Sequence, residues 1–216
     1  MRLLLAALAL ATMTLPASAS PFLVAHRGAS GEAPENTLPA FVLAWKQGAD
    51  AIEGDFHLTR DGHIVCFHDA DTRKRTGKKL LIRESTLNDL RKLDAGSWKD
   101  PKFAGTTIPT FREVADTVPA GRKFYIEIKC GPEIIPTLLN EITASALRTE
   151  QIVVISFNEE VIRELKRLRP QWTANVLVSF DRKVADAPER DWGALIAKLD
   201  EIQADGLGTS AHRDAM

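Results

Sequence analysis

Residues 51–69 read AIEGDFHLTRDGHIVCFHD, two strand-like runs joined by a tight turn. In a strand every second side chain faces the same way, so Glu53 and Asp55 share one face, about 6 to 7 Å apart along the strand. Asp61 and Gly62 are typical of a hairpin turn, after which the alternation of a strand puts Ile64, Cys66 and His68 on one side and Val65 and Phe67 on the other. This stretch predicts a hairpin that gathers carboxylates on one side.

Two carboxylates on one face of a strand repel each other unless a cation lies between them or the face is exposed to water. The pattern leaves both interpretations open. His68 ends the second run; a histidine there is usually structural, but beside two acids it is a candidate for proton transfer. His57 and His63 are expected to be exposed or structural.

Outward from this hairpin, strand and helix patterns alternate along the chain. The strands are expected at residues 22–25, 51–56, 63–68, 124–129, 152–157, 174–180 and 204–207, and the later helices at 133–148, 159–169 and 192–202. Such βαβα alternation predicts an α/β fold, and a (β/α)8-type TIM barrel is favoured over an open doubly wound sheet. The seven strands lack an eighth, so we expect a barrel truncated before its last strand.

Shorter helices are expected in the first half of the chain. The first should begin after Thr37 and end at Gly48, with Leu38, Phe41, Val42 and Trp45 on its buried face. A second is expected at residues 86–93, before an irregular segment that reads GSWKDPKFAG. A third should open at Pro109 and bury Phe111, Val114, Ala115 and Val118.

The stretch FYIEIK at residues 124–129 repeats the alternation of the hairpin, placing Glu127 and Lys129 on one face. One interpretation is an interior salt bridge between these two residues. The other is that Glu127 joins Glu53 and Asp55 at the same barrel mouth and completes an oxygen-rich site for a hard divalent cation. Zinc is less favoured, because the histidines do not have the spacing of zinc ligands.

Composition narrows the functional classes. The chain has 216 residues, 44% of them hydrophobic and 26% charged, with a formal net charge of -1, as in one soluble globular domain. A nucleic-acid binder would carry a marked basic surface. No glycine-rich phosphate loop follows a predicted strand, so the sequence lacks the usual motif of a nucleotide-dependent function. The basic cluster formed by residues 73–75, Lys78 and Lys79 is interpreted as a solvated loop rather than a phosphate-collecting patch.

Residues 1–19 have the pattern of an export signal, with Arg2, an apolar run and the small residues Ala17-Ser18-Ala19. We therefore expect an exported protein, periplasmic or secreted, whose barrel domain occupies residues 20–216. An uncleaved membrane anchor is the alternative, disfavoured because the apolar run is short. The two cysteines, Cys66 and Cys130, are expected to be free thiols rather than a disulfide.

Four stretches closely resemble the glycerophosphodiester phosphodiesterase family: HRGASGEAPENTLPAF from residue 26, EGDFHLTRDGHIVCFHD from 53, GSWKDPKFAGTTIPTFREV from 96 and FYIEIK from 124. The resemblance implies a phosphodiesterase barrel. It implies that His26 and His68 are the acid/base pair. It implies that Glu53, Asp55 and Glu127 are ligands of a divalent cation, Ca²⁺ or Mg²⁺. Arg27 and Lys129 are implied as phosphate contacts, and Glu35 and Asn36 as residues that line or brace the site.

The family resemblance implies a metal-dependent hydrolase of lipid metabolism that converts glycerophosphodiesters into an alcohol and sn-glycerol 3-phosphate. A cation with Arg27 and Lys129 suits a phosphodiester, whose oxygens gain negative charge in the transition state. Two alternatives are a lyase or phospholipase D-like activity on choline-bearing phospholipids, and a binding barrel without catalysis. The expected partner is a small-molecule substrate, with no nucleic acid and no stable membrane anchor; the head group and oligomeric state stay open.

Overall fold

The computed structural model describes residues 20–179 and 191–209. The predicted export signal at residues 1–19 lies outside these ranges. Within them, no helix combines the length and the apolar composition that crossing a membrane requires.

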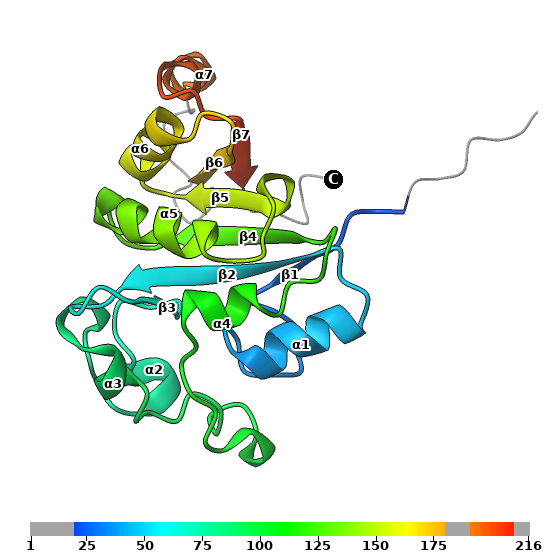
Figure 1. The fold of residues 1–216 in the computed structure, drawn as a ribbon, viewed down its shortest axis with the longest axis vertical. Helices are drawn as coiled ribbons and strands as arrows, with labels where there is room; N and C mark the ends of the chain where they lie inside the picture. The colour runs from blue at the N-terminus through cyan, green and yellow to red at the C-terminus, as the bar shows by residue number, and fades with distance from the viewer. Residues whose placement is uncertain (1–19, 180–190, 210–216) are drawn as a thin grey trace, which may run out of the picture.

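A sheet of mostly parallel strands forms the frame of the molecule (Figure 1). Its strands are β1 (Val24–His26), β2 (Ala51–Leu58), β3 (Ile64–Cys66), β4 (Lys123–Ile128), β5 (Ile152–Ser156), β6 (Thr173–Val178) and β7 (Gly206–Thr209). The order is β1-β2-β4-β5-β6-β7, and every neighbouring pair on this path is parallel. With helices in the connections, the described part of the chain forms an α/β half-barrel.

The count of seven barrel strands in the sequence-based prediction is wrong. Strand β3 pairs antiparallel with β2 and lies off the path of the parallel strands, so the described residues supply six strands to the half-barrel. The hairpin itself forms as predicted: Gly62, at φ 81°, donates its N–H to the Thr59 carbonyl. A strand that follows a tight turn runs antiparallel to its predecessor and cannot continue a parallel sheet.

Strand β1 is largely exposed and begins two residues after the start of the strand predicted at 22–25. Phe22 and Leu23 precede it and are 53% and 56% exposed, and Val24 is also exposed. The reason is its position at the end of the sheet, where β2 is its only strand partner in the described chain. The local apolar run predicted a strand but could not show that it would lie at an edge.

The helices are α1 (Leu38–Lys46), α2 (Arg73–Thr76), α3 (Leu87–Leu90), α4 (Phe111–Ala115), α5 (Ile135–Thr143), α6 (Glu159–Leu168) and α7 (Trp192–Glu201). Helices α3 and α4 begin one and two residues later than predicted, because capping boxes at Thr86 and Thr110 start them at the next residue. In α1, Ala40, Phe41 and Ala44 are buried whereas Val42 is 40% exposed, so the predicted buried face was wrong at Val42.

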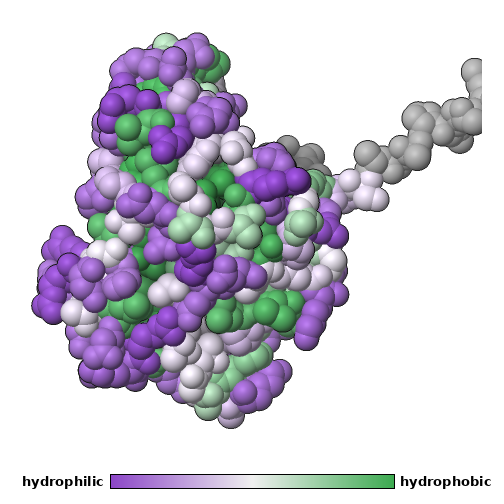
Figure 2. Space-filling view, in the orientation of Figure 1, coloured by the Kyte–Doolittle hydropathy of each residue, from purple (hydrophilic) through white to green (hydrophobic). Residues whose placement is uncertain are grey.

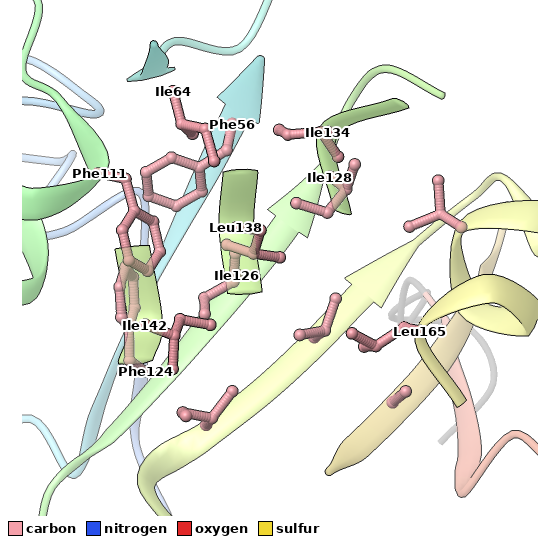
Figure 3. Close-up of a cluster of buried hydrophobic side chains, with 14 of the residues drawn as sticks. Phe56, Ile64, Phe111, Phe124, Ile126, Ile128, Ile134, Leu138, Ile142 and Leu165 are labelled. Carbon is pink, nitrogen blue, oxygen red and sulfur yellow. The ribbon is translucent and has the colours of Figure 1, made fainter. Parts of the chain in front are cut away.

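The main core lies between one face of the sheet and its covering helices. Alternate residues of β2 and β4, among them Phe56, Phe124 and Ile126, point into it, so the intervening residues face the other side. Three rings meet at its centre: Phe56 lies 5.4 Å from Phe111 and 5.7 Å from Phe124, edge to face in both cases (Figure 3). This core fixes which faces of β2 and β4 carry the polar side chains.

A second, smaller core lies beneath the segment that follows β3. Val65, Phe67, Ile82, Leu90 and Ile108 are buried in it, together with other apolar residues of that segment. Its outer surface, around α2 and α3, is largely hydrophilic in the view of Figure 2. The alternation along β3 thus separates two cores, because Ile64 and Cys66 face the main core and Val65 and Phe67 face the small one, as the sequence predicted.

Candidate active site

Polar residues gather where the parallel strands β1, β2 and β4 end. In the register of the sheet, His26 at the end of β1 is the partner of Glu53, and Asp55 is the partner of Glu127 on β4. The carboxyl ends of parallel strands form one rim, which is where α/β barrels carry their sites. The register therefore brings together residues that are up to 101 positions apart in the sequence.

Glu53, Asp55 and Glu127 form a buried cluster of carboxylates. One oxygen from each lies within 4.8 Å of the others, and the three side chains are 0 to 8% exposed. Burial, followed by the charge of Asp55, raises the pKa of Glu53 well above its usual value. Burial is also the main cause of the raised pKa of Glu127, against the opposing effect of its hydrogen bond with Lys129. Without a compensating cation, the three charges are costly to hold together.

The donor set fits a hard divalent cation. Glu53 Oε1 and Asp55 Oδ1 are fully buried, and no group in residues 20–179 or 191–209 donates a hydrogen bond to them. Buried carboxylate oxygens normally have a partner, so such orphaned atoms indicate a missing ligand. Carboxylate oxygens are the ligands that Ca²⁺ and Mg²⁺ prefer. The arrangement favours the cation-site interpretation of these acids over an exposed edge.

Two basic side chains border the acids. Arg27 Nε lies 3.2 Å from Asp55 Oδ2, and the backbone N–H of Arg27 donates to Glu53 Oε2 at 2.9 Å. Lys129 Nζ donates to Glu127 Oε1 at 2.7 Å and lies 3.6 Å from Asp55 Oδ1. The predicted salt bridge between Lys129 and Glu127 is therefore present beside the carboxylate cluster, and the two interpretations of FYIEIK are compatible.

The loop between β1 and α1 folds Glu35 and Asn36 against this site. Asn36 is buried and donates from Nδ2 to Asp55 Oδ2 at 2.7 Å. Its N–H donates to the carbonyl of Arg27 at 3.1 Å, which closes the loop. Arg27 and Asn36 both have φ of 58°, and Gly28 has φ of 77°. A Cβ at Gly28 would lie 2.7 Å from the backbone of Ala40, so only glycine allows α1 to approach this loop.

The two candidate histidines differ in their surroundings. The His26 side chain is 66% exposed and its Nε2 lies 3.9 Å from Glu53 Oε2. Its pKa is lowered by partial desolvation and by the nearby charge of Arg27. His68 is partly buried, and its Nδ1 lies 2.7 Å from Asp69 Oδ1. The structure brings both rings to the rim that carries the acids.

Asp69 is a site residue that the sequence interpretation missed. Its hydrogen bond with Nδ1 fixes the orientation of the His68 ring, and the other ring nitrogen, Nε2, takes no part in that bond. Partial burial alone would raise the pKa of Asp69, but its hydrogen bond with His68 and the nearby charges of Lys74 and Arg75 together lower that pKa below its usual value. The signal was the HD pair itself, because an acid directly after a candidate histidine can reach its ring. His57 has the expected structural role: it is buried, and its Nε2 lies 3.2 Å from the carbonyl oxygen of His68.

The basic cluster at residues 73–79 is not entirely a solvated loop. Four of its members are exposed as expected: Arg73, Lys74, Lys78 and Lys79. Arg75 instead turns toward the site and donates hydrogen bonds to both carboxylate oxygens of Glu35. The interpretation was therefore wrong for Arg75, because its partner is 40 residues away and no local pattern reveals it.

The cysteines are free thiols, as predicted. Burial raises the pKa of Cys66 well above its usual value, and it raises the pKa of Cys130 to about 11. Thiols with raised pKa values are poor nucleophiles. Neither cysteine is suited to covalent catalysis.

The chain is similar to proteins of one known family. The model of the glycerophosphoryl diester phosphodiesterase family matches residues 26–211, so the chain belongs to that family. The glycerophosphodiester phosphodiesterase of Caldanaerobacter subterraneus subsp. tengcongensis is 37% identical over 160 residues, covering 71% of this chain and 65% of that protein. The Bacillus subtilis glycerophosphodiester phosphodiesterase is 34% identical over 164 residues, covering 68% of this chain and 56% of that protein.

Among solved structures, an Oleispira antarctica phosphodiesterase in complex with the product sn-glycerol-3-phosphate has a similar fold. It is 32% identical, with a TM-score of 0.77, and the match covers 88% of this chain and 74% of that one. The matches to the two curated relatives span 56 to 65% of their length.

Proposed function

We propose that this chain hydrolyses glycerophosphodiesters to an alcohol and sn-glycerol 3-phosphate. The observation that carries the proposal is the buried cluster of Glu53, Asp55 and Glu127, which has orphaned oxygens and is bordered by Arg27 and Lys129. Family membership and the product bound to the Oleispira antarctica phosphodiesterase support it.

In this proposal the three acids hold a divalent cation, Ca²⁺ or Mg²⁺. When bound, the cation supplies positive charge that stabilises the negative charge developing on the phosphate oxygens. Arg27 and Lys129 add fixed positive charge on the same rim, where they orient the phosphodiester. Their links to Asp55 and Glu127 keep both side chains extended toward the site.

His26 and His68 divide the proton transfers. The free 2-hydroxyl of the glycerol moiety is an internal nucleophile with a large effective concentration. His26 accepts its proton while its oxygen bonds to phosphorus. The bond from phosphorus to the head-group oxygen breaks, and His68 protonates the departing alcohol. Water then opens the five-membered cyclic phosphate, with His68 as base and His26 as acid.

The complete barrel fold and the export of the chain are part of the same proposal. The six parallel strands form part of a (β/α)8 barrel, for which the family and the matched fold are the support. The chain is exported to the periplasm or secreted, on the strength of its first 19 residues. N-terminal sequencing of the protein from cell fractions tests the export: a mature chain that starts near Ser20 supports it, and an intact Met1 contradicts it.

The activity is tested by incubating the purified chain with glycerophosphocholine and following the products by ³¹P NMR, with and without a chelator. We expect sn-glycerol 3-phosphate, released only when Ca²⁺ or Mg²⁺ is present. A cyclic phosphate as the final product would support the lyase alternative. Binding of glycerophosphocholine without turnover would support a binding barrel and contradict the proposal.

A further inference from the structure

Glu35 lies between two arginines that come from different segments. Arg75 donates to both of its oxygens, from Nε to Oε1 at 3.1 Å and from Nη2 to Oε2 at 3.0 Å. Arg27 Nη1 donates to Oε1 as well, at 3.5 Å. The Glu35 side chain is 13% exposed, so its charge is compensated by these arginines more than by water.

The other face of Arg75 is held by an aromatic ring. Its guanidinium carbon lies 4.0 Å from the ring centroid of Trp98, within cation–π range. Trp98 is fixed in turn, since its Nε1 donates to the Ala95 carbonyl at 2.9 Å. The next residue, Lys99, donates to the carbonyl of Ser30 at 2.8 Å and ties this segment to the loop that carries Arg27. Arg75 is thus the member of the basic cluster that is built into the site.

The contacts of Arg75 affect the balance of charge around Arg27. Arg27 faces Asp55 at 3.2 Å and Glu35 at 3.5 Å, and two full carboxylate charges would neutralise its attraction for an anion. The bidentate bond from Arg75 offsets the charge of Glu35, because such paired hydrogen bonds between ions are strong and directional. Arg27 then keeps positive charge for a ligand, while Glu35 still braces its side chain.

We propose that Arg75, held in place by Trp98, is a positioning residue that neutralises Glu35 and so leaves Arg27 able to bind the phosphate group. This inference rests on the proposed function, in which Arg27 contacts the phosphodiester. It assigns a role to the segment between β3 and α4, because that segment carries Arg75, whose positive charge offsets the negative charge of Glu35.

The test is a double-mutant cycle in which binding of sn-glycerol 3-phosphate is measured by isothermal titration calorimetry in the presence of Ca²⁺. Arg75→Gln should weaken binding about tenfold, as loss of a charged hydrogen-bond partner does, and raise KM for glycerophosphocholine more than it lowers kcat. Adding Glu35→Gln to Arg75→Gln should restore most of the affinity, because no surplus carboxylate then faces Arg27. If Arg75 were only structural, the double variant would bind no better than the single one, and that result would overturn the inference.

Two further variants keep the test decisive if Arg75→Gln fails to fold. Arg75→Lys keeps the charge but loses the bidentate bond and the stacked plane, so it should bind with intermediate affinity. Trp98→Leu should weaken binding about threefold, the share expected of a partly exposed cation–π contact. Arg73→Gln, on the exposed side of α2, is the matched control and should bind as the wild type does. Wild-type affinity in Arg75→Lys and Trp98→Leu would overturn the inference.

The outcomes also separate this inference from the proposed function. A wild-type chain that binds sn-glycerol 3-phosphate but turns over no glycerophosphodiester contradicts the proposed function, while the binding cycle still tests Arg75. A wild-type chain that binds no sn-glycerol 3-phosphate overturns both. Turnover with unchanged binding in Arg75→Gln overturns the inference alone.

Discussion

Asn36 and Asp55 form a closed pair of hydrogen bonds: Asn36 Nδ2 donates to Asp55 Oδ2 at 2.7 Å, and the N–H of Asp55 donates to Asn36 Oδ1 at 3.1 Å. Both residues are buried. The pair fixes one carboxylate oxygen of Asp55 and leaves Oδ1 directed at the candidate cation site, with no hydrogen bond from the described residues. The Asn36 amide therefore orients a proposed metal ligand.

We expect Asn36→Ala to lower the free energy of unfolding by about 2 kcal/mol, because two buried groups of Asp55 lose their partner. Part of the loss comes from φ of 58°, which asparagine tolerates better than alanine. Ca²⁺ affinity should fall roughly tenfold, as is usual when a ligand loses its supporting hydrogen bond. Urea unfolding in chelator and calcium titration measure the two effects. Asn140→Ala, at an exposed position of α5, is the control; equal values for both variants would refute the role of Asn36.

Glu53→Gln should have opposite effects with and without metal. Burial raises the pKa of Glu53, so in the wild type the folded state becomes less stable as the pH rises above the ordinary glutamate pKa of 4.5 and the group is forced to ionise. Glutamine avoids that cost. In chelator at pH 7 the variant should therefore unfold at higher urea than the wild type, and the difference should vanish in acid.

With Ca²⁺ in hundredfold excess over its dissociation constant, the wild type should gain about 2.7 kcal/mol of stability. Glu53→Gln should gain much less, because it has lost an anionic ligand. A variant that is less stable than the wild type in chelator at pH 7, or that gains as much from Ca²⁺, would show that Glu53 is not a ligand under charge repulsion.

Asp69→Asn should lower kcat for glycerophosphocholine roughly tenfold or more, because the His68 ring loses the carboxylate that orients it for proton transfer. A substrate with a nitrophenol leaving group needs no protonation, so the variant should hydrolyse it at close to the wild-type rate. Steady-state kinetics on both substrates measure the split. Asp116→Asn, at an exposed position after α4, serves as the control. Equal losses on both substrates would argue for a structural defect.

The 2-hydroxyl of the substrate should be required. We expect a 2-deoxy analogue of glycerophosphocholine to be nearly inert, because water lacks the effective concentration of an internal hydroxyl. His68→Ala should be partly rescued by the nitrophenol substrate, whereas His26→Ala should not. Equal turnover of the deoxy analogue would establish direct attack by water, and a reversed rescue pattern would exchange the roles of the two histidines.

Lys166→Met should destabilise the fold by roughly 2 to 3 kcal/mol, because it leaves buried carbonyls without a donor. Lys166 is 5% exposed, and its Nζ donates to the carbonyls of Pro170 and Trp172 and to Asp205 Oδ2. These bonds fasten the end of α6 to the start of β6 and to the approach to β7. Thermal unfolding compares the variant with Lys46→Met, an exposed lysine of α1. Similar melting temperatures for the two would contradict the prediction.

The sequence by itself determined the local patterns. Alternation along β2 and β4 predicted correctly that Glu53 and Asp55 share one face and that Glu127 and Lys129 share another, because the period of two is a property of each strand alone. The helical pattern of α6 and α7 predicted both helices to within one residue. Family motifs extended this to a set of candidate site residues, since each motif lies within one short stretch.

Only the tertiary structure decided which stretches meet. Arg75 bonds Glu35 across 40 residues, although its own segment had the pattern of a solvated loop, and Lys166 bonds Asp205 across 39. Strand β3 had the alternation of a barrel strand, but its pairing with β2 took it off the parallel path. Periodicity reports how a residue is oriented within its element, whereas burial and charge partners depend on packing between elements that are distant in sequence. The cluster of Glu53, Asp55 and Glu127 was therefore predictable from the sequence, whereas the pairing of Arg75 with Glu35 was not.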